Sequence, residues 1–213
     1  MQLCNSQSLI KRQVMEKSQV SKFYSAQLGL LLITLIFSHG VFADPLKRSQ
    51  AFVDAFKAIS SNDEAAFKPI DEYIDFTYLS EQAIQPHRDK FNEDQVKVFK
   101  ENFKSLIRLI AYPDTGKFFR ENKYEYGKVV EKNNMSFVPM NVLVVAEDLD
   151  MELGYYWHQV DKQWRLADMS IDGDSLIKDY QNQFGRIINK DSVDELLKKL
   201  KNKIAEIKAK NNA

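Results

Sequence analysis

The chain has 213 residues, with 30 Lys and Arg against 30 Asp and Glu, so its formal net charge at pH 7 is zero. This balance argues against general nucleic-acid binding, which needs a strongly positive field. The only cysteine is Cys4, which excludes a disulfide within the chain and a thiolate cluster for a metal.

An apolar run, Leu28–Phe37, predicts a secretion signal. It is too short to span a bilayer comfortably, and it leads to Val41-Phe42-Ala43, whose first and last positions suit signal peptidase. Four basic residues precede it: Lys11, Arg12, Lys17 and Lys22. We predict a signal peptide over residues 1–43, with Met15 as an alternative start. An uncleaved membrane anchor is the other interpretation.

Cleavage after Ala43 leaves a single domain over residues 44–213, with 26 Lys and Arg and 29 Asp and Glu. Its net charge is −3, and it contains no thiol. These 170 residues suffice for one domain with a sizeable core. We see no internal repeat or linker in this part of the sequence.

The first half of the mature chain predicts helices. Phe52, Val53 and Phe56 share a face of the first one, and short helices with breaks near Pro69 and Pro86 follow. The longest helix is predicted from about Glu93 to Tyr112, with a reciprocal cap between Asn92 and Gln95. We expect Pro113 to end it, and a short helix to follow around Lys117 to Asn122. Its apolar stripe comprises Val96, Phe99, Phe103, Leu106, Ile107 and Ile110.

Four strands come next, separated by turn sequences at Asn133-Asn134, Glu147-Asp148 and Asp161-Lys162. The second, Met135 to Ala146, is apolar on both faces, as expected of a covered central strand. The third, from Leu149, alternates apolar and polar residues, which is typical of a half-buried antiparallel strand. The fourth is predicted from Gln163 to Ile171.

An Ile-Asp-Gly turn with Gly173 in a left-handed conformation leads from the fourth strand into an amphipathic helix. The last helix begins at Ser192, with Glu195 placed for a capping box. Its lysines form either a solvated face or a docking surface: Lys198, Lys199, Lys201, Lys203, Lys208 and Lys210. Helices packed on an antiparallel four-stranded meander predict an α+β domain.

The sequence offers little for catalysis. We expect His87 and His158 to be ordinary surface residues, and two isolated histidines make a poor metal site, so no metal or cofactor is predicted. Strand alternation places Asp168 on the same face as Trp164 and Leu166, which we take to be inward. Such a carboxylate is either a general base or ligand anchor, or a structural group bound to backbone amides.

The strand, turn and helix from Trp164 to Phe184 resemble the C-terminal signature of the MlaC/toluene-tolerance family of periplasmic phospholipid-binding proteins. The matching residues are Trp164, Asp168, Ile171, Asp172, Gly173, Ser175, Leu176, Tyr180, Gln183 and Phe184. Two positions depart from the usual pattern. Gln181 stands where the family usually has Arg, and Asp174 stands where it often has an apolar residue.

The resemblance implies a twisted sheet curled around helices, similar to the nuclear-transport-factor/cystatin-like cone with additional helices. It also implies a deep apolar cavity for phospholipid tails. On this basis we predict that the lipid contacts side chains from the long helix, the second and third strands, and the helix after the turn: Phe99, Phe103, Leu106, Ile110, Val142, Val144, Tyr155, Trp157, Leu176, Tyr180 and Phe184.

The role implied by the family is that of a periplasmic phospholipid shuttle, monomeric and non-enzymatic, connected with outer-membrane lipid asymmetry and toluene tolerance. Its expected partners are phospholipid, an inner-membrane ABC transporter complex with an MCE-domain subunit, and an outer-membrane lipoprotein complex. Two alternatives stay open: a small cone-fold enzyme with Asp168 as general base, and a non-catalytic interaction module with a filled core.

Overall fold

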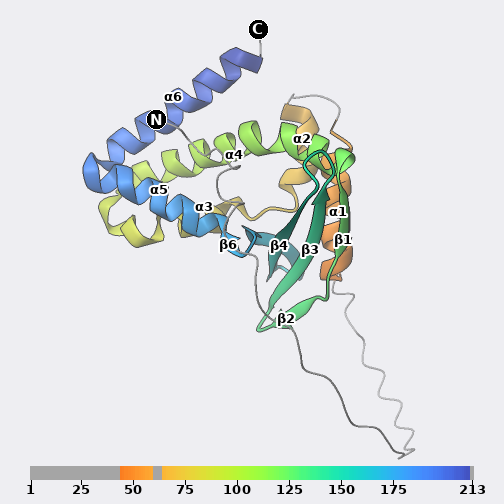
Figure 1. Cartoon of the computed structure of the whole chain (residues 1–213). Coiled ribbons are helices and arrows are strands. Elements are labelled where there is room, and N and C mark those ends of the chain that lie inside the picture. Colours follow the sequence, from red (N-terminus) through yellow and green to blue (C-terminus); the bar gives the residue numbers. More distant parts are fainter. Residues whose placement is uncertain (1–43, 60–63, 212–213) are drawn as a thin grey trace, which may run out of the picture. The chain divides into compact units, whose positions relative to one another are not determined.

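The computed structural model describes residues 44–59 and 64–211 (Figure 1). The predicted signal peptide, residues 1–43, lies outside the described residues. The described helices are α1 (Pro45–Lys57), α2 (Glu64–Asp71), α3 (Phe76–Ile84), the 3₁₀ helix η2 (Gln85–Lys90), α4 (Glu93–Glu121), α5 (Leu176–Lys190) and α6 (Val193–Asn211). The strands are β1 (Lys123–Tyr126), β2 (Val130–Lys132), β3 (Met135–Val144), β4 (Leu149–Val160), β5 (Gln163–Ile171) and β6 (Asp174–Ser175).

All strands pair in one antiparallel sheet in the order β1-β3-β4-β5-β6, and β2 also pairs with β3. The α+β prediction is therefore confirmed, with more strands than expected. The predicted first strand is divided into β1 and β2, because the chain loops out opposite Pro139, which has no N–H for the ladder. The backbone N–H of Gly127 in this loop donates a hydrogen bond to the Pro139 carbonyl.

The turns between the strands form where the sequence predicts them. Asn133 and Asn134 have φ angles of 51° and 58°, and Asp161 and Lys162 have φ angles of 49° and 63°. Such left-handed pairs match the twist of the strands that they join. After β5, Gly173 has a φ of 85° and directs the chain into β6 and α5.

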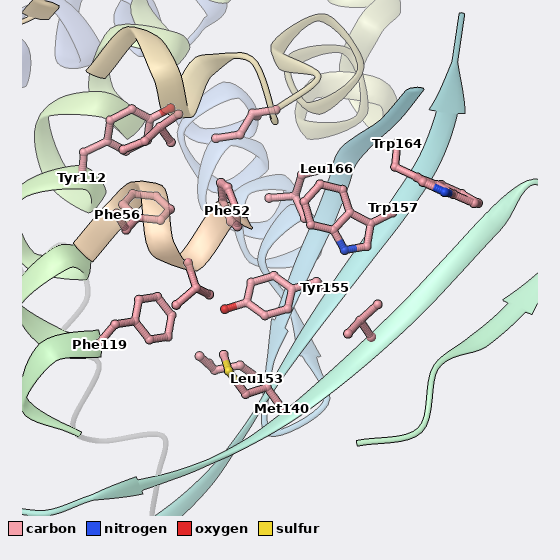
Figure 2. Packing of buried hydrophobic residues seen from close by; sticks show 14 of the residues in the cluster. Phe52, Phe56, Tyr112, Phe119, Met140, Leu153, Tyr155, Trp157, Trp164 and Leu166 are labelled. Atoms are coloured by element: carbon pink, nitrogen blue, oxygen red, sulfur yellow. The ribbon is translucent and has the colours of Figure 1, made fainter. Parts of the chain in front are cut away.

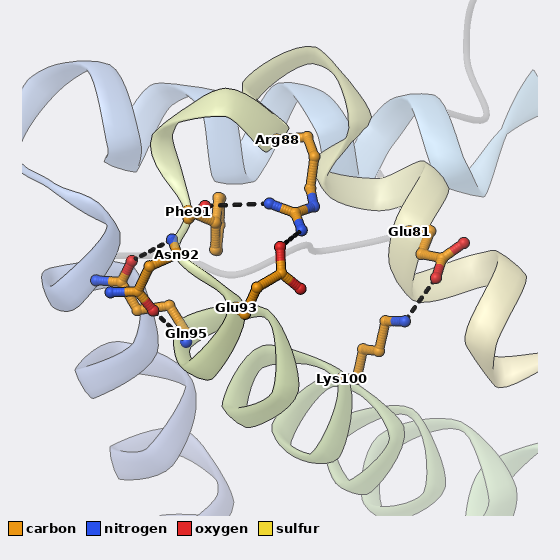
Figure 3. A network of polar contacts seen from close by, with 7 residues as sticks. All are labelled: Glu81, Arg88, Phe91, Asn92, Glu93, Gln95 and Lys100. Carbon is orange, nitrogen blue, oxygen red and sulfur yellow. Dashed lines mark hydrogen bonds and ion pairs between the residues drawn. The ribbon is translucent and has the colours of Figure 1, made fainter.

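The helix starts are capped largely as predicted. Asn92 accepts a hydrogen bond from the backbone of Gln95, whose side chain accepts one from the Asn92 backbone (Figure 3). Ser192 accepts one from the Glu195 backbone at the start of α6. These caps satisfy N–H groups that have no partner within the helix.

The prediction that Pro113 ends the long helix is wrong, because Pro113 lies inside α4, which continues to Glu121 as one helix. The predicted break near Pro69 lies just after it: Pro69 is inside the last turn of α2, which ends at Asp71, and α3 begins at Phe76. A proline within a helix costs about 3 kcal/mol, and packing on both sides of Pro113 offsets this cost. Tyr112 is buried and donates a hydrogen bond to Asp71, and Phe119 is buried against the sheet side.

The buried apolar side chains form two clusters. The sheet cluster joins α1, α2 and the C-terminal half of α4 to the inner face of the sheet: Phe52, Val53, Phe56, Phe67, Ile70, Ile74, Tyr112, Phe119, Val138, Met140, Val142, Leu153, Tyr155, Trp157, Trp164 and Leu166 (Figure 2). The helix cluster joins α3, the N-terminal half of α4, α5 and α6: Ala83, Ile84, Phe91, Val96, Phe99, Phe103, Leu106, Phe184, Ile188, Val193, Leu196 and Leu200. α4 is the longest element and contributes to both.

No helix within residues 44–59 and 64–211 combines the length and the apolar character needed to cross a bilayer.

We predict that Gly116→Ala destabilises the protein by about 1–3 kcal/mol. Alanine normally stabilises a helix by up to about 1 kcal/mol relative to glycine, so the expected sign is reversed. The reason is that a Cβ at this position would lie 2.5 Å from the Phe56 carbonyl oxygen, where α4 crosses the end of α1. Urea denaturation measures the change. Lys117→Ala, an exposed site on the same helix, is the control and should change stability by less than about 0.5 kcal/mol.

Candidate functional site

The predicted site residues of the sheet share its inner face. Val142 pairs with Met151, and Tyr155 pairs with Val138, so these side chains point to the same side as Trp157 and toward α1. Tyr155 and Trp157 are fully buried, and their rings lie 6.0 Å and 5.7 Å from the ring of Phe52. Val144 lies half-buried at the end of β3. The sheet therefore presents one continuous apolar and aromatic wall to the helices (Figure 2).

The predicted site residues of the helices form a second aromatic group. Phe99 and Phe103 stack with ring centroids 5.4 Å apart, and Tyr180 meets the ring of Phe103 edge-on at 4.9 Å. Phe184 lies 5.4 Å from Phe99, and Leu106 is buried in the same cluster. This group belongs to the helix cluster, whereas the strand residues belong to the sheet cluster, so the structure distributes the predicted site over two cores.

Two of the predicted residues lie at the margins of these cores. Ile110 is 48% exposed, although it lies seven residues after Phe103 and therefore on the same face of α4. The helix cluster ends before Ile110, because from Tyr112 onward α4 buries a different face against the sheet cluster. Leu176, the first residue of α5, is half-buried.

The two clusters meet at a boundary that we call the seam, formed by Leu79 of α3 and Ile107 of α4. Both side chains are partly buried, and each packs against the sheet cluster and against the helix cluster. Neither residue is in the predicted lipid-contact set. Ile107 was visible in the apolar stripe of the long helix, but nothing in the sequence marks Leu79, which lies in a short helix between two breaks.

A small charged group borders the seam at the junction of α2 and α4. The Asp71 carboxylate lies 3.1 Å from the Lys104 ammonium and 3.5 Å from Nε of Arg108, and it accepts a hydrogen bond from the Tyr112 hydroxyl at 3.0 Å. Burial raises the pKa of Tyr112 well above its usual value, and the negative charge of Asp71 adds to this shift. Tyr112 is therefore a neutral donor at physiological pH.

Two hollows are the best defined in the described part of the chain. The larger is an open polar groove of about 520 Å³ lined by His87, Gln181, Asn182, Gly185, Arg186, Asn189 and Lys190. The smaller, of about 10 Å³, has room for about one water and is lined by Phe67, Ser105, Arg108, Leu109 and Lys208. Neither is the deep apolar cavity that the resemblance implies, because neither is lined by any of the residues predicted to contact the lipid.

Asp168 does not share a face with Leu166, so that prediction is wrong. Trp157 pairs with Leu166 while Tyr156 pairs with Asp168, which leaves Ala167 as an extra residue in β5. This β-bulge reverses the alternation, so Asp168 lies on the outer face with Tyr156. No local pattern of residues marks the bulge.

Both carboxylate oxygens of Asp168 hold the start of α5. One accepts hydrogen bonds from the backbone N–H groups of Met169 and Ile177 at 2.8 Å and 3.1 Å. The other accepts one from the hydroxyl of Ser175, the residue that caps α5 through the N–H of Lys178. The structure therefore favours the interpretation of Asp168 as a structural aspartate. Its hydrogen bonds hold the end of β5 against the start of α5.

Known proteins share the sequence pattern and the fold of this arrangement. The family model described as MlaC protein matches residues 54–202, which include both clusters almost entirely. The chain belongs to the MlaC family. No curated protein matches it.

A solved structure shares the fold. It is that of the phospholipid-binding protein from Ralstonia solanacearum in complex with a phospholipid, with a TM-score of 0.58 and 20% sequence identity. The similarity covers 77% of this chain and 88% of that protein. The mixed fold with an antiparallel sheet covered by helices is thus confirmed as the fold of this MlaC-family chain.

The positions at which this MlaC-family chain departs from the expected signature have defined contacts. The Gln181 amide donates a hydrogen bond to the Gln82 carbonyl at 2.8 Å and so joins α5 to α3. Asp174 is exposed and pairs with Ile171 in the turn. Gln181 therefore serves here in packing between helices.

The two histidines are less exposed than predicted. Nε2 of His158 lies 3.0 Å from the Asp75 carboxylate, and the Tyr78 ring lies 4.6 Å from the imidazole. His87 is half-buried against Gly185, where an added Cβ would lie 2.6 Å from its Nε2. Within the part of the chain that the structure describes, no group of three or more His, Cys, Asp or Glu side chains could hold a metal ion.

We predict that Asp168→Ala destabilises the protein by about 1–3 kcal/mol, because the half-buried N–H groups of Met169 and Ile177 and the Ser175 hydroxyl lose their acceptor. Thermal or urea unfolding measures the loss. Asp174→Ala is the matched control, since it removes an exposed carboxylate from the same turn and should cost less than about 0.5 kcal/mol. Equal stability of the two variants would contradict the structural role of Asp168.

Proposed function

We propose that this protein is a periplasmic phospholipid-binding shuttle, which carries glycerophospholipid between the outer and the inner membrane. The observation that carries the proposal is its membership in the MlaC family over residues 54–202, on a fold with one buried apolar cluster on the sheet and a second among the helices. The related structure from Ralstonia solanacearum, which contains a phospholipid, supports the same function.

The energetics of lipid transfer explain why such a carrier is needed. Each methylene group exposed to water costs about 0.8 kcal/mol, so two acyl chains with some thirty methylenes cost on the order of 25 kcal/mol. A protein that covers most of both chains removes most of this barrier. Its affinity for the lipid must be close to that of the bilayer and not much higher, because tighter binding would prevent release at the acceptor membrane.

In our proposal the acyl chains enter at the seam and separate the two clusters. The helix cluster is built from α3, α4, α5 and α6, while α1, α2 and the sheet carry most of the other cluster. In the empty protein each cluster is packed within itself and the two meet at the seam, which keeps their apolar side chains out of water. Bound chains then replace contacts between the clusters with contacts to lipid, so that little apolar surface is exposed in either state.

The remaining parts of the proposal come from the family. The signal peptide over residues 1–43 would direct the chain to the periplasm, where it would serve as the soluble component of an MCE-type ABC transport system. It would exchange lipid with an inner-membrane transporter complex and an outer-membrane lipoprotein complex.

The lysines of α6 are less suited to docking than their number suggests. Four of them form ion pairs with acidic residues of the helix or its N-terminal flank: Lys198, Lys199, Lys203 and Lys210.

One observation favours a second function, a non-catalytic interaction module. The aromatic side chains of α4 and α5 that were predicted to line the cavity contact one another, as they would in a filled core. Lipid analysis separates the two functions. The full chain, expressed in the periplasm of a Gram-negative host and purified without detergent, should yield about one glycerophospholipid per protein on solvent extraction and mass spectrometry. An interaction module would yield none.

We predict that Ile107→Glu lowers the lipid content at least tenfold, because a carboxylate at the seam would be buried among acyl chains without a partner, at a cost above about 1.4 kcal/mol. In the empty protein this half-buried position lets the carboxylate reach water, so the fold should persist. Val98→Glu, at an exposed site on the same helix, is the control and should keep its lipid. Unchanged lipid content in Ile107→Glu would remove the seam from the binding site.

A further inference from the structure

The Tyr155 hydroxyl is a buried polar group without a partner in the protein. Tyr155 lies in the middle of β4 and is fully buried, and within residues 44–59 and 64–211 its hydroxyl oxygen makes no hydrogen bond. Such a group loses its contacts with water on folding and gains nothing in return, whereas most buried polar groups in proteins are hydrogen-bonded. A phenylalanine would fill the same space without this cost. An acceptor supplied by a ligand would remove the cost.

The polar groups beside this hydroxyl do have partners. Nε1 of Trp157, on the same face of β4, donates a hydrogen bond to the Ser49 hydroxyl oxygen at 2.8 Å. The Tyr126 hydroxyl of β1 donates one to the Ser49 carbonyl at 3.3 Å. The Tyr124 hydroxyl accepts one from the Lys57 ammonium at 3.2 Å. The unpaired hydroxyl is therefore an exception among its neighbours on the inner face of the sheet.

The surroundings of the Tyr155 hydroxyl are apolar. The ring of Tyr155 lies 6.0 Å from that of Phe52, and Val138 is its partner on β3. Figure 2 shows the hydroxyl directed away from the strand, toward Phe56 and Phe119 of the two helices that cover it. All of these side chains belong to the sheet cluster. An acceptor at this depth should itself be uncharged, because burying an unpaired charge among apolar groups costs far more than burying a neutral one.

The hydroxyl is itself uncharged at physiological pH. Burial raises the pKa of Tyr155 well above its usual value, and the nearby Tyr126 and Tyr124 add to this shift. The group is therefore a neutral donor that faces the apolar interior.

Two other buried polar atoms of the inner face also lack a partner in the described ranges, the Ser136 hydroxyl oxygen and Nε1 of Trp164. Both residues are second in their strands, and the pairing of the strands places them at the end of the sheet where β4 finishes. Neither is in the predicted lipid-contact set. Tyr155 is in that set and lies in the centre of the sheet.

We infer that the Tyr155 hydroxyl donates a hydrogen bond to an ester carbonyl oxygen of the bound glycerophospholipid. This inference rests on the proposed function and deepens it, because it names a polar contact that the lipid makes once its chains lie against the sheet cluster. The ester carbonyls are uncharged acceptors, and they lie between the acyl chains and the phosphate. Since every diacyl glycerophospholipid contains them, the contact favours ester-linked lipids and leaves the head group free to vary.

A competition between ester and ether lipids tests this. The protein, expressed as the full chain and purified from the periplasm, is incubated with vesicles of a diester phosphatidylcholine and its diether analogue in equal amounts. The two lipids have the same chains and differ only in the two carbonyl groups. After re-isolation and solvent extraction, mass spectrometry should show the diester enriched about tenfold on the native protein, as the loss of one hydrogen bond from a buried donor predicts. In Tyr155→Phe the ratio should fall to near that of the vesicles.

The stability of the empty protein provides a second readout. After delipidation, Tyr155→Phe should resist urea at least as well as the native protein, because the substitution removes a hydroxyl that has no partner. A clear loss of stability would show that the hydroxyl is hydrogen-bonded within the empty protein, and it would overturn the inference.

The neighbouring tyrosine offers a matched control. Tyr156 is half-buried and lies on the outer face of the sheet, opposite Asp168. Tyr156→Phe removes the same atom and should keep the native ratio of the two lipids. An unchanged ratio in Tyr155→Phe, an equal loss in Tyr156→Phe, or a native protein that takes up both lipids equally overturns the inference and leaves the proposed function intact. A native protein that binds neither lipid refutes both.

Discussion

The structure depends on one helix being continuous past a proline. α4 packs Phe99, Phe103 and Leu106 into the helix cluster and then Tyr112 and Phe119 into the sheet cluster, with Pro113 between the last two. If the helix ended at Pro113, the sheet cluster would lose the segment that closes it. Because a single rigid element serves both cores, it sets where they meet, and Ile107 and its neighbouring cations lie at that point.

In the proposed function this division gives the acyl chains a route into the molecule, since neither of the two hollows described for residues 44–59 and 64–211 is a deep apolar cavity. A single closely packed core resists opening, because every displaced side chain loses contacts on all sides. Two cores that meet along partly buried side chains lose much less when they separate. Elsewhere the helix and sheet sides are held together locally, by the Asp168 hydrogen bonds at the start of α5 and by the pair of Asp75 and His158 beside α3.

Much of the fold could be predicted from local chemistry, and the failures share a cause. The turns at Asn133-Asn134 and Asp161-Lys162 and the cap at Asn92 depend on their own residues, so the sequence predicts them. Pro113 within a helix and the bulge at Ala167 depend on contacts with distant segments, which no local pattern contains. For the candidate site, apolar periodicity predicted the buried side chains of α4 and of the strands, but their division into two clusters and the seam at Leu79 follow from packing alone.

The central claim is that the two clusters separate to admit acyl chains. Distances between spin labels measured by pulsed electron resonance test it directly, in a Cys4→Ser background that leaves no native thiol. Labels at exposed Asp54 of α1 and Asn182 of α5 span the seam, while labels at Asp54 and Glu125 of β1 stay on the sheet side. The account predicts that phospholipid lengthens the first distance and leaves the second unchanged. Equal distances across the seam in the empty and the lipid-loaded protein would contradict it.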